Sequence, residues 1–263
     1  MTSLEIIKVL LVASIASYLL SSLMYGIGRR KYGTALFVAG WIGGISIFMI
    51  NWLESSAPPF GNMYQVQVFL SICFLPLYLF LCGRDGLNWT GSYFAAVSGL
   101  SLIGAFFMSP DVTWKRMPAL QSPWFVPHVT SYMISYALAA VGFILYLVGK
   151  MKEMRGNISS DNMYDKALYS ILRLSFPFMT FGMLSGALWA EEAWGTYWSW
   201  DRKETWSLIT WILYLIYFHC LTRKELRKHA GLVQVLAFLA LLTTFFIVNL
   251  WPKLSSALHS YSQ

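Results

Sequence analysis

The stretch VPHVTSYMISYALAAVGFILYLVG, residues 126–149, runs for 24 residues without an aspartate, glutamate, lysine or arginine. A helix needs about 20 mostly apolar residues to cross the hydrocarbon core of a bilayer. The stretch therefore predicts a membrane-spanning helix, with one histidine, His128, close to its start.

Apolar segments of the same kind recur along the whole chain. The other seven are residues 7–27, 34–53, 66–83, 92–109, 167–190, 205–222 and 232–251. Charged residues make up 12% of the chain, against about 25% in a soluble domain. We therefore expect an all-α, polytopic transmembrane bundle of about eight spans, with residues 1–263 forming a single integral membrane domain.

The loop cations predict the orientation of the spans, because lysine and arginine gather on the cytoplasmic side. The alternating loops of one set hold Arg29, Arg30, Lys31, Arg84, Lys150, Lys152, Arg155, Arg223, Lys224, Arg227 and Lys228. The other set holds only Lys115, Arg116, Arg202, Lys203 and Lys253. The first set is predicted to be inside, which places both the N-terminus and the C-terminus outside.

The net charge of +7 follows mostly from this topology. The cations are spread over loops rather than gathered in one groove, so nucleic acid is excluded as a partner. The three cysteines lie in or at the ends of apolar spans and are predicted to be packing residues, because a disulfide framework needs exposed positions. They are Cys73, Cys82 and Cys220.

The most unusual segment is WAEEAWGTYWSWDRKETWSLITW, Trp189–Trp211, which holds six of the twelve tryptophans, four acidic residues and two basic ones. It falls on the predicted outer face. An aromatic belt at the membrane interface would explain Trp189, Trp206 and Trp211. A belt does not explain the crowding of Trp194, Tyr197, Trp198 and Trp200 around Gly195, which favours a binding surface for a large, flat, apolar ligand.

Histidines lie at both predicted faces. His128 and His259 fall on the outer side, near the tryptophan segment, and His219 lies inside a span near its cytoplasmic end. Two neutral imidazoles are a standard axial pair for haem iron. The alternatives are that His128 and His259 are polar residues in a wet interface and that His219 reaches toward the inner headgroups. His229, in a basic inner loop, is predicted to be solvated.

Haem carries two propionates that need cations, and arginine suits carboxylates best because it can pair with both oxygens. Candidates on the outer face are Arg202, Lys203, Lys115 and Arg116. For the acidic residues we favour another role. DRKETW opens directly onto a span, so Asp201 or Glu204 is predicted to cap its N-terminus.

The segment WGTYWSWDRKETW resembles the tryptophan-rich WWD signature of the CcsA/ResC family of cytochrome c biogenesis membrane proteins. VPHV with SYMISYALA, YLIYFH and NLWPKLSSALHSY resemble the histidine-bearing segments of that family. The resemblance covers about residues 124–263, and the first four spans match only as hydrophobic helices. The family commonly has proline after the aspartate of the motif, whereas this chain has Arg202, which puts the local backbone shape in question.

The resemblance implies a haem-binding subunit of a cytochrome c synthase (haem lyase) that acts with a CcsB/ResB-like partner. His128 and His259 would be the axial ligands of transiently bound haem b at the outer face. His219 would hold haem within the membrane together with a histidine of the partner. The cradle would be Trp194, Gly195, Tyr197, Trp198, Trp200, Asp201, Arg202 and Trp206. Haem would then be joined to the Cys-x-x-Cys-His motif of an apocytochrome c, in a bacterial cytoplasmic membrane or a thylakoid membrane.

Two alternatives remain open. One is a haem-binding relative without ligation chemistry, either delivering haem to a carrier as CcmC proteins do or regulating haem synthesis as HemX proteins do. The other is a transporter or quinone-binding scaffold whose tryptophans are only anchors. Transporters often have broken helices and charges at mid-membrane, and only Arg173 and Pro177 hint at that here.

Overall fold

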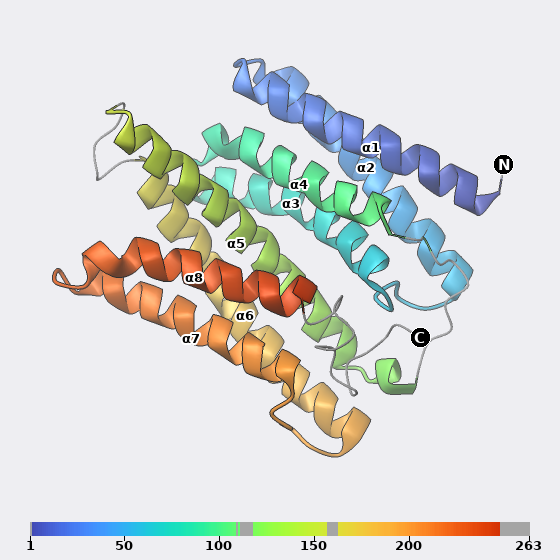
Figure 1. The fold of residues 1–263 in the computed structure, drawn as a ribbon. Coiled ribbons are helices and arrows are strands. Elements are labelled where there is room, and N and C mark those ends of the chain that lie inside the picture. Colours follow the sequence, from blue (N-terminus) through green and yellow to red (C-terminus); the bar gives the residue numbers. More distant parts are fainter. Residues whose placement is uncertain (1, 109, 111–117, 157–162, 248–263) are drawn as a thin grey trace. The chain divides into compact units, whose positions relative to one another are not determined.

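The computed structural model describes residues 2–108, 110, 118–156 and 163–247, and the regular elements in those ranges are all helical (Figure 1). This confirms the expected all-α helical bundle. The helices fall into two compact units, Met1–Leu120 and Gln121–Gln263, which we call the N-terminal and C-terminal units. The boundary lies close to residue 124, where the segments that resemble the WWD family begin.

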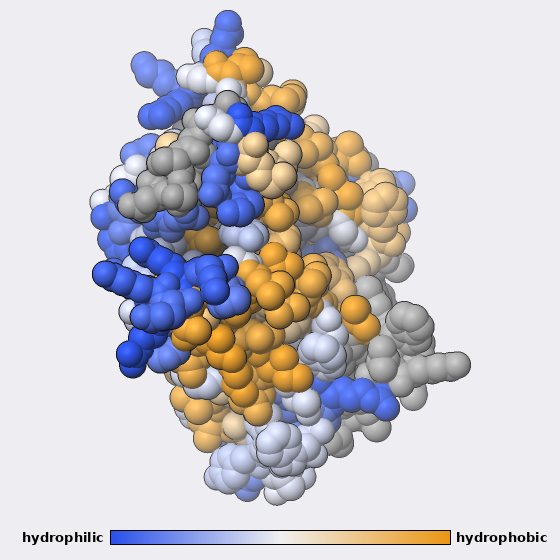
Figure 2. Space-filling view, turned by 60° about the vertical axis from the view of Figure 1, so that its left-hand side comes forward, coloured by the Kyte–Doolittle hydropathy of each residue, from blue (hydrophilic) through white to orange (hydrophobic). Residues whose placement is uncertain are grey.

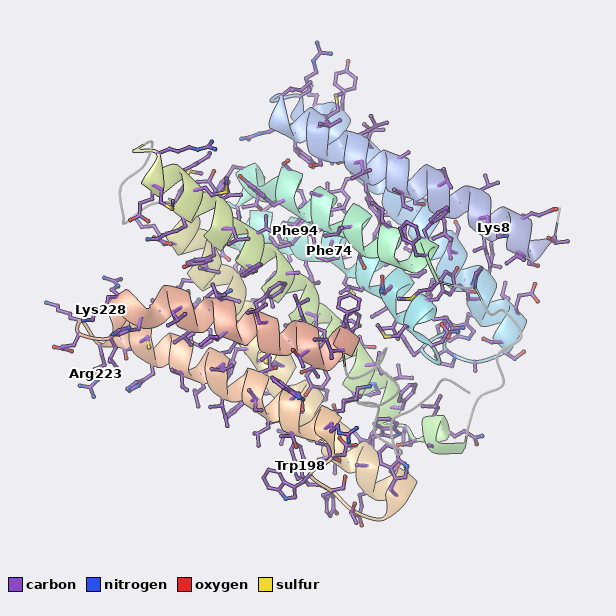
Figure 3. All side chains as sticks on the ribbon, viewed as in Figure 1. Lys8, Phe74, Phe94, Trp198, Arg223 and Lys228 are labelled. Carbon is purple, nitrogen blue, oxygen red and sulfur yellow. The ribbon has the colours of Figure 1, made fainter. Side chains whose placement is uncertain are left out.

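The N-terminal unit contains four long helices. They are α1 (Ser3–Gly26), α2 (Arg30–Ser55), α3 (Met63–Asp85) and α4 (Gly91–Phe106), with a short turn η1 (Asn88–Thr90) before α4. α1 packs against α2 and α4, and α3 packs against α4 and α2. Phe74 on α3 and Phe94 on α4 are fully buried and mark the core of this unit (Figure 3).

The C-terminal unit is built from two antiparallel helix pairs. Its elements are η2 (Pro118–Gln121, at the unit boundary), α5 (Phe125–Met154), α6 (Met163–Trp194), α7 (Arg202–Thr222), η3 (Arg227–His229), α8 (Ala230–Leu242) and the π-helical turn η4 (Thr243–Ile247). α5 packs along α6 and α7 along α8, and the pairs meet where α5 contacts α8 and α6 contacts α7. The hydroxyl groups of Ser135 on α5 and Ser175 on α6 lie 2.9 Å apart, a buried polar link of the kind that joins membrane helices.

Seven helical stretches of the described residues are long and apolar enough to cross a membrane: α1, α2, α3, α5, α6, α7 and Arg227–Ile247. The remaining predicted span corresponds to α4, whose 16 residues rise only about 24 Å, less than the roughly 30 Å of a hydrocarbon core. Hydrophobic side chains gather in broad surface patches in Figure 2, beside separate hydrophilic clusters. The protein is therefore a polytopic integral membrane protein.

Two smaller predictions are also settled by the helices. Cys73 on α3 and Cys220 on α7 are buried, as predicted for packing residues, and Cys82 near the end of α3 is half-buried. α6 runs continuously through Pro177, and Arg173 is exposed on its surface. The hint of a broken transporter helix in this span was therefore wrong.

Candidate functional site

His128 lies in the first turn of α5 and faces α6. Its backbone N–H donates to the carbonyl of Trp124 at 3.0 Å, within the opening turn of the helix. Its Nδ1 lies 2.8 Å from the carbonyl oxygen of Gly182 on α6. A carbonyl oxygen can only accept, so Nδ1 carries the proton and Nε2 keeps the lone pair of the neutral ring. Nε2 is therefore the nitrogen that can bind a metal.

Trp189 connects His128 to the segment of residues 194–201 between α6 and α7, which we call the tryptophan loop. Its side chain is only 2% exposed. Its ring centroid lies 5.4 Å from that of His128, 5.1 Å from that of Phe125 and 4.9 Å from that of Trp194. The explanation of Trp189 as a belt anchor is wrong, because a belt residue faces the lipid headgroups whereas this ring lies inside the C-terminal unit.

Trp211 also serves packing within the protein. Its indole N–H donates to the hydroxyl of Thr180 on α6 at 2.9 Å, and its ring stacks on Phe176 with the centroids 5.5 Å apart. The ring thus joins α7 to α6, so the belt explanation fails here too. Trp206, one turn into α7, is half-buried.

The loop between α6 and α7 presents aromatic side chains at the end of the unit. Gly195 ends α6 with a φ of +75°, a conformation that favours glycine. Tyr197 and Trp200 are 57% and 68% exposed. Trp198 lies edge-on to Trp200 with the centroids 5.9 Å apart, and its buried Nε1 has no hydrogen-bond partner among the described atoms. Figure 3 shows Trp198 at this end of the unit.

Trp200 has a φ of +60°, which is uncommon for a residue with a side chain, and its neighbours hold it there. The Glu204 carboxylate accepts from the backbone N–H groups of Ser199 at 2.8 Å and Asp201 at 3.2 Å. Asp201 in turn accepts from the N–H of Glu204 at 2.8 Å, which completes a capping box at the start of α7. The predicted capping role of these acids is confirmed, and the box fixes the backbone on both sides of Trp200.

Replacing Glu204 by alanine is expected to lower the free energy of unfolding by about 2 kcal/mol, because the loop N–H groups lose a charged acceptor. Amide hydrogen exchange at Ser199 and Asp201 should accelerate. Glu191→Ala, which removes a nearby carboxylate from α6, is the control and should leave both measurements nearly unchanged. Unaltered exchange in Glu204→Ala would show that other contacts hold the loop.

Of the four cationic residues predicted to meet a propionate, two lie within the described part of the chain. Arg202 is the first residue of α7 and is exposed, and Lys203 beside it is half-buried. With Arg202 in the usual place of proline, α7 still begins directly after Asp201, so the helix start that proline would favour is kept. Lys115 and Arg116 lie outside the described residues, as does His259.

His219 lies at the far end of α7 from the tryptophan loop. It is exposed, and it follows Arg202 by 17 residues, a rise of about 26 Å along the helix. It shares an exposed face of α7 with Ile212, Leu215 and Ile216. The structure therefore separates His219 from His128 in depth and leaves its side chain at the surface of the unit.

Three sets of contacts join α5 and the residues before it to α6, at the end of the C-terminal unit that bears the tryptophan loop. The hydroxyl of Ser122, just before α5, donates to Glu192 near the end of α6. His128 binds α6 through Gly182, and Trp189 contacts both His128 and Trp194. Of the predicted site residues, the structure thus brings His128 and the tryptophan loop to one end.

Sequence reasoning assigned Trp189 to an aromatic belt, and it missed two glycines that precede Trp189 on α6, Gly182 and Gly186. The available signal is their four-residue spacing in GMLSG, which is typical of close contacts between membrane helices. The spacing alone does not name the residue that approaches the glycines.

Fold and site together define a class: polytopic helical membrane proteins that present an aromatic loop beside an oriented histidine. The chain belongs to the family described as "Cytochrome C assembly protein", whose model matches residues 60–255.

Named relatives agree with this family. The chain is 37% identical to the cytochrome c biogenesis protein CcsA of Chlamydomonas reinhardtii, over 82% of this chain and 64% of the relative. It is 30% identical to CcsA of Mesostigma viride, covering 99% of this chain and 98% of the relative. The family and these relatives support a role in cytochrome c maturation.

Among solved structures, the cytochrome c haem lyase CcmF has the same fold. The TM-score is 0.70 at 17% identity, with 94% of this chain matched to 47% of CcmF. At this identity the likeness concerns the fold alone.

Proposed function

We propose that the protein is the haem-binding subunit of a cytochrome c synthase, which moves haem b to the outer face and presents it for attachment to apocytochrome c. The observation that carries the proposal is the hydrogen bond from Nδ1 of His128 to the Gly182 carbonyl, at 2.8 Å. Histidines that bind a metal almost always donate their other ring N–H to such a carbonyl or a carboxylate, which fixes their orientation.

The residues at this end of the C-terminal unit have the chemistry that a porphyrin needs. A porphyrin supplies four nitrogens of its own, so the protein would have to provide only the remaining ligands, of which His128 is proposed as one. Tyr197 and Trp200 offer exposed aromatic area to a flat ring, and the buried N–H of Trp198 has no acceptor among the described residues. Arg202 is exposed on the same loop end for a propionate. His259 is proposed as the second axial ligand.

The proposed orientation places this loop outside and the basic turn between α7 and α8 inside. In Figure 3, Trp198 lies at one end of the α7–α8 pair, whereas Arg223 and Lys228 lie at the other. The turn carries Arg223, Lys224, Arg227 and Lys228, whereas the loop end carries Arg202 and Lys203. An excess of lysine and arginine is what the positive-inside rule expects of a cytoplasmic end. Both chain termini are then outside, in a bacterial cytoplasmic membrane or a thylakoid membrane.

His219 is proposed to hold haem within the membrane, together with a histidine of a CcsB/ResB-like partner. An exposed imidazole among lipid-facing aliphatic residues is costly unless another group meets it. Ile212, Leu215 and Ile216 lie one to two turns before it on the same exposed face of α7, so a partner helix or a haem could reach it there. Haem bound at His219 would lie nearer the inner face than haem bound at His128. This order of sites is expected of a protein that moves haem outward.

The test is an absorption spectrum of the complex purified with its partner from haem-replete cells. We expect a Soret band of histidine-ligated haem, and we expect c-type cytochromes to be lost when the gene is deleted while haem synthesis stays normal. A colourless complex would contradict the proposal. Retained c-type cytochromes with altered haem synthesis would instead favour a regulator of haem synthesis.

A further inference from the structure

Gly182 and Gly186 form a bare patch on α6, which we call the glycine face, and the His128 ring lies directly against it. A Cβ added at Gly186 would lie 2.5 Å from Nδ1 and 2.6 Å from Cε1 of His128. A Cβ added at Gly182 would lie 3.1 Å from the ring of Tyr132. Only glycine at position 186 lets the imidazole come this close to the helix backbone.

The close approach has a chemical consequence for the imidazole. It brings Nδ1 to 2.8 Å from the Gly182 carbonyl, an oxygen that also accepts from the Ser185 hydroxyl at 3.2 Å. Ordinary contact between heavy atoms is about 3.5 Å, so a methyl group at position 186 would push the ring away by about 1 Å. The distance from Nδ1 to the carbonyl would then exceed the range of a hydrogen bond.

Two aromatic rings limit where the imidazole can move. Trp189, one turn beyond Gly186 on α6, lies 5.4 Å from the His128 ring with the planes 36° apart. Tyr132, one turn along α5, meets it edge-on at 5.1 Å. With these rings beside it and the glycine face behind it, the imidazole has one well-defined pose.

We propose that Gly186, with Gly182, is a positioning residue that holds the proton of His128 on Nδ1 and so makes Nε2 the nitrogen offered to iron. The inference that His128 binds iron rests on the function proposed above. The orientation of the His128 ring does not depend on that function. A purely structural glycine contact is found at Gly142 of α5, where an added Cβ would lie 3.2 Å from the flexible end of Leu168 and 3.4 Å from that of Leu172.

The first test is nitrogen NMR of the haem-free full chain, labelled with ¹⁵N at histidine, with the His128 signals assigned by their loss in His128→Ala. Wild-type protein is expected to carry the proton on Nδ1, and Gly186→Ala is expected to lose that preference. Gly142→Ala, the matched control for a methyl group added between α5 and α6, should keep it. A wild-type proton on Nε2 would overturn the proposal, even if Gly186→Ala did not fold.

The second test is a double-mutant cycle on haem occupancy. Gly186→Ala is expected to weaken haem binding by roughly tenfold to a hundredfold, the usual effect of losing a group that orients a metal ligand. In a His128→Ala background the same change should add almost nothing, because the residue it positions is gone. An equal loss in both backgrounds would show general packing and refute the positioning role. Absence of haem from the wild type would instead refute the proposed function and leave the NMR result to stand alone.

Discussion

Under the proposed function, replacing His128 by alanine is expected to remove one axial ligand of the haem and to lower the yield of c-type cytochrome by roughly tenfold or more. The Gly182 carbonyl and the ring of Trp189 hold the imidazole in place. The Soret band of the purified complex should shift and weaken. Free imidazole should restore part of the original spectrum, because it can occupy the space left by the side chain.

His229→Ala is the matched control for His128→Ala. His229 is an exposed histidine in η3, at the other end of the unit from the tryptophan loop. Its loss should leave both the spectrum and cytochrome assembly unchanged. If His128→Ala behaved like His229→Ala in both measurements, His128 would not be a ligand.

Trp189→Ala is expected to cost about 3–5 kcal/mol of stability, the range for removing a large buried aromatic side chain. Trp189 is 2% exposed and contacts the rings of Phe125, His128 and Trp194, so its loss opens a cavity at the site end of the C-terminal unit. The Tm in detergent should fall by about 6–20 °C, since 1 kcal/mol corresponds to about 2–4 °C in a chain of this size. Haem binding should fall as well, because the ring that contacts His128 is gone.

The control for this variant is Trp52→Ala. Trp52 is 41% exposed on α2, so its removal should change the Tm far less. Trp189→Phe should recover most of the stability, because an aromatic ring would still fill the space. A Tm for Trp189→Ala equal to that of Trp52→Ala would contradict the packing role.

Much of this architecture could be predicted from local sequence. The apolar stretch 126–149 lies within α5, and DRKETW forms the predicted capping box of Asp201 and Glu204. These features depend on residues a few positions apart, so hydropathy and short-range hydrogen bonding determine them. The crowding of aromatic side chains in residues 194–200 predicted a binding surface, and Tyr197 and Trp200 of this segment are exposed in the structure.

The belt explanation of Trp189 failed because hydropathy does not distinguish a tryptophan that faces lipid from one that faces a neighbouring helix. The length of the fourth predicted span was also overestimated, since α4 ends at Phe106. The burial of Trp189 depends on packing between helices, which a single hydrophobic pattern does not contain.

The sequence by itself determined that this is a helical membrane protein with a tryptophan-rich loop and a histidine close to its proposed outer face. The tertiary structure decided which nitrogen of His128 carries the proton, because the acceptor is the carbonyl of Gly182, 54 residues away. It also decided that Trp189 is buried and that Gly186 must lack a side chain. These are contacts between α5 and α6, and they exist only once the two helices have packed together.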